Sequence, residues 1–163
     1  MINRVVSAFS TANPKLFLFA GQGTQEIGML NSIPDSLKEE TLIKASILLD
    51  LDIKEILTED KSKKINQTEI TQPLLMLSHY LHFKSSGFHE DLSQSDWMIG
   101  HSLGEFSALV NAGSLSLEEG LKLVHLRGSL MKKHTTSPHG MLIVKYKPEK
   151  EEVVLEEIRK ASL

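Results

Sequence analysis

An α/β fold is predicted for this 163-residue chain, because segments typical of strands alternate with segments typical of helices. Two short apolar runs, at 16–20 and 97–99, each stop at a glycine, as buried strands often do. The segments between and after them place apolar residues at helical spacing. With 40% hydrophobic residues, the chain can bury the core of about one ordinary domain.

The first half of the chain predicts one strand followed by helices. The run at 16–20 is continuously apolar, which predicts a strand buried on both faces. Residues 36–57 have apolar positions at mixed three- and four-residue spacing, which indicates one or two helices. A charged connection at 58–67 follows. The next helix is predicted over 71–83, with Pro73 in its first turn, where the missing N–H costs least.

The second half repeats the strand-then-helix pattern. The run 97–99 predicts a strand, and helices are predicted over 103–111 and 117–133. Ser116 is the expected N-cap of the last of these, which has acidic residues in its first turn and lysines in its last. Both ends of this helix therefore agree with its macrodipole.

The tail changes character after a polar loop at 135–140. A strand is predicted over 141–146 and an amphipathic, charge-rich helix over 149–160. The loop is the best candidate for a domain boundary, because no other stretch resembles a linker.

Composition excludes several kinds of site. Without cysteine, the chain has no disulfide, no thiolate metal site and no cysteine nucleophile. Its 18 basic and 21 acidic residues give a net charge of −3, so no nucleic acid partner is expected. Its apolar runs are far shorter than the roughly 20 residues that span a bilayer, so no membrane segment is expected.

The first fifteen residues differ in composition from the rest. They contain Arg4, Lys15 and several hydroxyl side chains, and no acidic residue occurs before Glu26. Organelle transit peptides share these properties, so residues 1–15 predict a mitochondrial or other organellar protein. A frayed terminus on a cytoplasmic protein is the alternative.

Residues 100–104, Gly-His-Ser-Leu-Gly, match the pattern G-x-S-x-G between a predicted strand and a predicted helix. In that context the serine stands on a sharp turn with its hydroxyl exposed. The N–H groups at the start of the following helix would stabilise an oxyanion. Ser102 is therefore the candidate nucleophile, and a plain tight turn with a helix cap is the alternative.

A second glycine-rich turn, at 21–25, follows the first predicted strand. Loops at the carboxyl ends of strands in an open sheet can meet at one site, so Gln22 is a candidate donor to the oxyanion. A turn with polar caps explains the same residues. The spacing of its glycines does not match a nucleotide-binding loop.

Arg127 lies within an otherwise apolar helical stretch. The periodicity favours a surface cation whose alkyl part covers its apolar neighbours. The alternative is a planar, bidentate clamp for a carboxylate, which lysine would imitate poorly.

Four motifs together resemble the malonyl-CoA:acyl carrier protein transacylases of type II fatty acid synthesis. They stand in the family's order and approximate spacing, and the resemblance extends from residue 16 to about 145. They are Phe-Ala-Gly-Gln-Gly-Thr-Gln at 19–25, Thr-Gln-Pro at 71–73, the segment 100–113, and Arg127-Gly128 with Met131. The chain departs from the family at Ala20, where proline is usual, which should change turn stiffness more than chemistry.

The resemblance implies a ping-pong acyl transfer without a metal or other cofactor, since malonyl-CoA is itself a substrate. Ser102 would take the malonyl group as an ester and pass it to the phosphopantetheine thiol of acyl carrier protein, the expected partner. The full enzyme would be a monomer. The remaining roles implied are the oxyanion hole for Gln22 and the backbone N–H of Leu103, the malonyl carboxylate clamp for Arg127, and lining of the site for His101 and Gln72.

The resemblance also implies a hydrolase-like three-layer core with a parallel sheet, interrupted by a small ferredoxin-like α+β subdomain. Residues 16–139 would be the N-terminal part of the core, and 140–163 the first strand and helix of the subdomain. None of the seven histidines matches the family's base, which lies further along. The chain is therefore expected to be about the first half of such an enzyme and inactive alone.

Two other functions stay open. A natural truncated product would act only by binding a partner. A serine thioesterase or esterase of the α/β-hydrolase type would share G-x-S-x-G but would need neither Gln22 nor Arg127.

Overall fold

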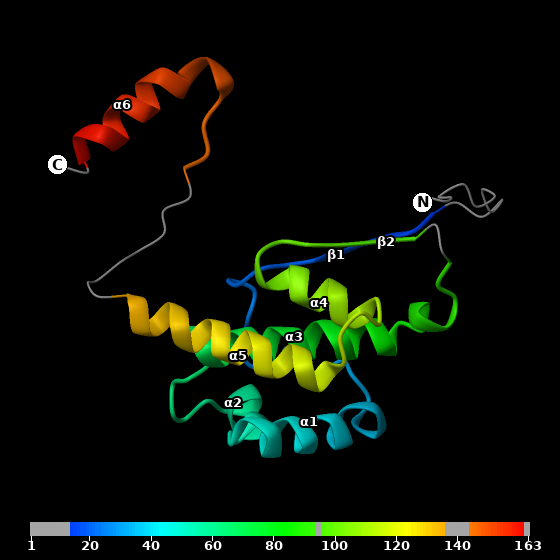
Figure 1. Ribbon diagram of the computed structural model, residues 1–163. Coiled ribbons are helices and arrows are strands. Elements are labelled where there is room, and N and C mark those ends of the chain that lie inside the picture. Colours follow the sequence, from blue (N-terminus) through cyan, green and yellow to red (C-terminus); the bar gives the residue numbers. More distant parts are fainter. Residues whose placement is uncertain (1–13, 94–95, 136–143, 162–163) are drawn as a thin grey trace, which may run out of the picture.

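A computed structural model describes residues 14–93, 96–135 and 144–161 and confirms the α/β fold (Figure 1). The expected targeting segment falls outside these residues, apart from its last two. In chain order the elements are β1 (Leu16–Phe19), α1 (Asp35–Leu49), α2 (Ile53–Thr58), α3 (Thr68–Ser85), the 3-10 turn η1 (Phe88–Glu90), β2 (Trp97–Gly100), α4 (Leu103–Asn111), α5 (Leu117–His134), the 3-10 turn η2 (Pro148–Lys150) and α6 (Glu151–Ala161).

The sheet is parallel, as predicted. β1 pairs with β2 in a register that sets Leu16 opposite Trp97 and Phe19 opposite Gly100. The carboxyl ends of both strands therefore meet at one edge. The two loops that follow are in close contact there, since a Cβ on Gly21 would lie 2.9 Å from Nδ1 of His101.

Helices cover only one face of this sheet in the described part of the chain. On the covered face, the Phe17 ring meets the Phe83 ring of α3 with a centroid distance of 5.2 Å. The opposite face exposes four large side chains: Leu16 (57%), Leu18 (72%), Trp97 (66%) and Ile99 (49%). The prediction of a strand buried on both faces is thus wrong for β1, because no described element forms the layer on that side.

The central helix is α3, which contacts α4, α5 and α1 and lies below the sheet in the view of Figure 1. It begins three residues earlier than predicted, which puts Pro73 inside the helix and not in its first turn. Since proline has no N–H, the carbonyl of Glu69 loses its partner within the helix. Nδ1 of His125, from α5, donates to that oxygen at 2.9 Å. A side chain of α5 thus completes α3.

Three glycines permit close approach between elements. A Cβ on Gly100 would lie 1.9 Å from the carbonyl carbon of Gly104, and a Cβ on Gly104 would lie 2.1 Å from the carbonyl oxygen of Phe19. A Cβ on Gly128 would lie 2.5 Å from Cα of Glu69. The start of α4 therefore presses against the sheet, and α5 against the first turn of α3.

Replacing Gly104 with alanine is expected to lower the free energy of unfolding by more than about 3 kcal/mol, because the new methyl group meets backbone that cannot move aside. Gly120→Ala is the matched control within a helix. Its Cβ would meet side-chain atoms of Val110 and Met76, so a loss of no more than about 1–2 kcal/mol is expected. Urea unfolding of both variants measures the difference, and equal losses would refute the close-approach explanation.

The tail agrees with the prediction only in part. α6 and its charge-rich sequence are confirmed, and its main contacts are with η2. Of the strand predicted over 141–146, the first three residues lie outside the described ranges, and 144–147 have no regular structure. A strand needs a hydrogen-bonded neighbour, and the two described strands pair with each other. None of the described helices is long and apolar enough to cross a bilayer.

Candidate functional site

Ser102 stands on the sharp turn between β2 and α4, as the motif predicts. Its φ of 55° and ψ of −109° are strained for a residue with a side chain. The strain falls on the serine itself, since Gly100 and Gly104 do not have a positive φ. The side chain of Leu103 is fully buried and anchors the first residue of α4. Its N–H belongs to the group of helix N-terminal donors that have no intrahelical acceptor.

Arg127 of α5 reaches the serine directly. One guanidinium nitrogen, Nη2, donates to Oγ of Ser102 at 3.0 Å, and Nη1 donates to Oε1 of Gln72 at 2.7 Å. The guanidinium carbon lies 5.9 Å from the centroid of the Phe106 ring. Arg127 is therefore held inside the site by both ends of its fork, and is not a cation extended into solvent.

A chain of hydrogen bonds continues from Arg127 to the turn after β1. The buried Gln72 donates through Nε2 to Oγ1 of Thr68 at 3.1 Å and to Sδ of Met131 at 3.3 Å. The Thr68 hydroxyl donates to Oε1 of Gln22 at 3.0 Å. The structure thus joins Ser102, Arg127, Gln72 and Gln22, which the sequence singled out separately.

His101 belongs to the serine turn through its backbone, and the Ser102 hydroxyl has one partner among the described residues. The His101 backbone N–H donates to the Phe19 carbonyl at 3.0 Å, which holds the serine turn to β1, while its side chain is exposed. Within 14–93, 96–135 and 144–161, Arg127 is the only hydrogen-bond partner of the Ser102 hydroxyl. No described histidine bonds to the Ser102 hydroxyl, and the described residues include no cluster suited to a metal ion.

Sequence reasoning missed Thr68 and Phe106. Thr68 precedes Gln72 by four residues in one helix, so helical spacing alone places both on one face. Recognition of this spacing would have added Thr68 to the site. Phe106 joins the site through its contact with Arg127, which is distant in the sequence and which no local spacing predicts.

His79 is a buried titratable group outside the site. It lies beneath β1, with its ring centroid 5.7 Å from that of Phe19 and Nδ1 2.9 Å from Oγ of the fully buried Ser107. Burial lowers the pKa of His79 to about 4, with a smaller contribution from His82. His79 is thus neutral in the folded protein at any pH well above 4.

The folded protein is expected to lose stability as the pH falls from 6.5 to 4, because in that window the unfolded chain binds a proton at His79 and the folded chain does not. The contribution is complete above the unfolded pKa and amounts to at most on the order of 3 kcal/mol. Urea unfolding of wild type and His79→Gln at several pH values measures it. On acidification, the free energy of unfolding should fall more in wild type than in His79→Gln. An equal fall in both would contradict the lowered pKa of His79.

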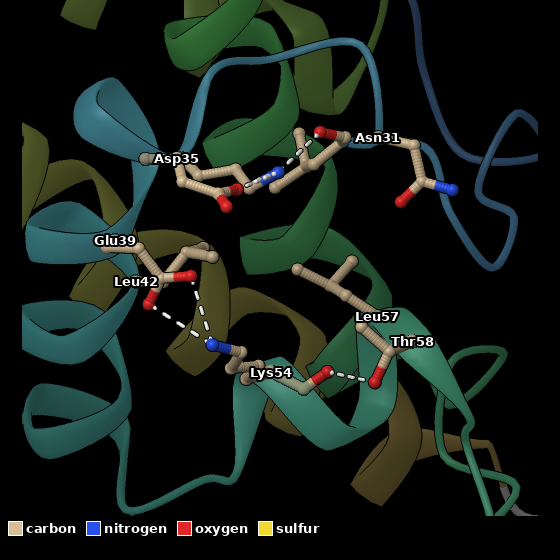
Figure 2. A pocket seen from close by; sticks show the side chains of 9 residues that line it. Asn31, Asp35, Glu39, Leu42, Lys54, Leu57 and Thr58 are labelled. Atoms are coloured by element: carbon tan, nitrogen blue, oxygen red, sulfur yellow. Dashed lines mark hydrogen bonds and ion pairs between the residues drawn. The ribbon is translucent and has the colours of Figure 1, made fainter.

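A hollow of about 190 Å³ lies between α1 and α2 (Figure 2), and Ser102 is not among the residues that line it. Asp35 pairs with Lys38 at 2.9 Å, and Glu39 pairs with Lys54 at 3.0 Å. Lys38 also donates to the carbonyl oxygen of Leu30. Because the charged groups that line the hollow satisfy one another, they tie α2 to α1 and leave no unpaired charge for a ligand.

Comparison with known proteins finds relatives that match more than two thirds of this chain. The sequence is 41% identical over 118 residues to the malonyl CoA-acyl carrier protein transacylase of Staphylococcus aureus (strain MRSA252), which covers 70% of this chain and 36% of the relative. It is 37% identical over 115 residues to a polyketide biosynthesis malonyl CoA-acyl carrier protein transacylase of Bacillus subtilis (strain 168), with 71% and 39% covered. The chain thus spans less than two fifths of the length of these relatives.

Solved structures agree. A malonyl CoA-acyl carrier protein transacylase from Burkholderia pseudomallei superposes with a TM-score of 0.75 at 30% identity, over 92% of this chain and 51% of that one. A type II PKS acyl-carrier protein in complex with its malonyl-transacylase gives 0.72 at 29% identity, with 91% and 49% covered. The family model described as "Acyl transferase domain" matches residues 16–159. This chain belongs to the acyl transferase domain family.

Proposed function

We propose that this chain carries the nucleophile and the carboxylate clamp of a malonyl transferase of type II fatty acid biosynthesis. The enzyme would move a malonyl group from malonyl-CoA to the phosphopantetheine thiol of acyl carrier protein. The observation that carries the proposal is the hydrogen bond between Arg127 and Ser102. It sets a fixed cation beside the oxygen on which the acyl ester would form.

The reaction has two balanced halves. In the first, Oγ of Ser102 attacks the thioester carbonyl, the C–S bond breaks, and the serine proton leaves with the CoA thiol. In the second, the carrier thiol attacks the malonyl ester, its proton returns to the serine, and the malonyl thioester departs. We assign the stabilisation of the oxyanion in both halves to the Leu103 N–H at the start of α4 and to the turn that bears Gln22, whose side chain bonds to Thr68.

The Arg127 guanidinium would make the site selective for malonyl over acetyl groups. Arginine has only donors, and in the free site one of them is directed at the serine hydroxyl. When that oxygen becomes an ester, the free carboxylate of malonate can accept from the same guanidinium. An acetyl group offers no such acceptor and leaves a half-buried charge poorly solvated.

The names of the relatives support the substrate and the partner, since each includes malonyl CoA or an acyl carrier protein. A thioesterase of the α/β-hydrolase type would have no use for a guanidinium at the serine. The proton acceptor of the first half-reaction is not among the described residues. We propose that it belongs to the part of the domain that relatives have outside the matched span, so that the 163-residue chain alone does not turn over.

An assay with labelled malonyl-CoA tests the function. The full-length product of the reading frame that contains this chain should transfer label to acyl carrier protein and release little malonate to water without it. Release to water irrespective of the carrier would identify a thioesterase. The 163-residue chain by itself should transfer no label, and rapid transfer by it would refute the proposed position of the base.

We also propose a mitochondrial location, for which the composition of residues 1–15 is the support. Fluorescence of a fusion protein with and without these residues tests it. Cytoplasmic signal from both fusions would contradict it.

A further inference from the structure

We propose that Thr68, the first residue of α3, is a positioning residue that orients the carboxylate clamp and the oxyanion turn together. This inference rests on the proposed function for its kinetic consequences. Its structural basis is the Thr68 hydroxyl, which bonds to Gln72 on one side and to Gln22 on the other.

The chemistry of the donors fixes the direction of each hydrogen bond in the series from Arg127 to Gln22. Arg127 can only donate, so the Gln72 oxygen must accept from it. The Gln72 amide nitrogen must then face the other way, where it donates to Thr68. With its oxygen accepting that bond, the Thr68 hydroxyl donates its own hydrogen to the Gln22 oxygen.

Without the hydroxyl, the bond from Arg127 would still orient the Gln72 oxygen, but the Gln72 amide nitrogen would lose its strong acceptor. The other acceptor of its nitrogen is Sδ of Met131, and a thioether is a weak acceptor. A rotated amide would turn its N–H₂ group toward the Arg127 guanidinium, setting donor against donor. Since Gln72 is fully buried, the cost is not relieved by water.

The packing around Thr68 keeps this group stationary. A Cβ on Gly128 would lie 2.7 Å from the Thr68 carbonyl oxygen, so α5 lies directly against this residue. His125 bonds to the next carbonyl, that of Glu69, and Lys132 pairs with the Glu69 carboxylate. Arg127 and Thr68 are therefore held in one packed unit. A small reorientation at Thr68 would change the position of the Arg127 guanidinium relative to Ser102.

The test compares Thr68→Val, which removes the hydroxyl at constant shape, with Thr68→Ser, which keeps it. Thr58→Val is the matched control, because the exposed Thr58 hydroxyl bonds to the Lys54 carbonyl on α2. Loading of Ser102 by malonyl-CoA and by acetyl-CoA is measured on the full-length product. Thr68→Val should lower kcat/KM for malonyl-CoA by roughly 10–100-fold and the malonyl-to-acetyl ratio by about tenfold. Thr68→Ser should stay within about threefold of wild type, and Thr58→Val should be unchanged.

An unchanged malonyl-to-acetyl ratio in Thr68→Val would overturn the proposal, because loss of a merely structural residue would lower kcat/KM for both substrates alike. Equal defects in the valine and serine variants would overturn it as well. If Thr68→Val does not fold, Thr68→Ala serves in its place.

Side-chain NMR separates this inference from the proposed function. Thr68→Val should shift the side-chain amide signals of Gln72 and Gln22 and the guanidinium signals of Arg127, and Thr68→Ser should not. If wild type loads neither acyl group, the proposed function fails and these spectra still decide the role of Thr68. Unshifted signals in Thr68→Val would overturn it.

Discussion

Replacing Ser102 with alanine abolishes covalent malonyl loading if the strained turn holds the nucleophile. The loading rate should fall by at least roughly 10⁴-fold, because no other described hydroxyl stands at the start of α4 beside the Arg127 guanidinium. Intact-protein mass spectrometry after exposure of the full-length product to malonyl-CoA measures the adduct.

Ser62→Ala is the matched control for this change. Ser62 is exposed on the charged connection after α2, and its hydroxyl lies 3.5 Å from the Glu55 carboxylate. This variant should load like wild type. A malonyl adduct on Ser102→Ala at the wild-type rate would show that another residue is the nucleophile.

Replacing Arg127 with alanine should cost malonyl loading far more than acetyl loading. We expect kcat/KM to fall by roughly 10²–10³-fold for malonyl-CoA and by less than about tenfold for acetyl-CoA, since only malonate has a carboxylate to lose its partner. Competition between the two thioesters, followed by mass spectrometry of the loaded serine, gives the ratio in one measurement. Equal losses for both would exclude the clamp.

Two further variants separate charge from geometry at this position. Arg127→Lys keeps a cation but cannot donate to Gln72 and a carboxylate with one planar group, so it should recover only part of the malonyl rate. Lys122→Ala removes an exposed cation from the same helix and should leave the malonyl-to-acetyl ratio unchanged.

The elements and the turn at Ser102 could be predicted from sequence because their causes are local. The cap at Ser116, confirmed as a capping box with Glu119, and the turn at Ser102 depend on neighbouring residues alone. Arg127 is the contrasting case. Its helical periodicity favoured a surface cation, and only contacts with Gln72 and Ser102, distant in the sequence, bring it into the site.

The errors at Pro73 and in β1 have the same origin. A proline is expected in a first turn because its helix cannot replace the lost hydrogen bond, whereas here another helix does so. An apolar run predicts burial on both faces, but whether a layer exists on each side depends on the rest of the fold. Both outcomes depend on tertiary partners that a local pattern does not contain.

The bond from His125 to the Glu69 carbonyl, which Pro73 leaves without a partner in α3, also bears on the dynamics of the site. Since α3 lacks one of its own hydrogen bonds and α5 supplies the replacement, the two helices should open and close in a single cooperative step. Arg127 stands on one of them, and Gln72 and Thr68 on the other. Transient opening would therefore separate Arg127 from Gln72 and Thr68 in the same step.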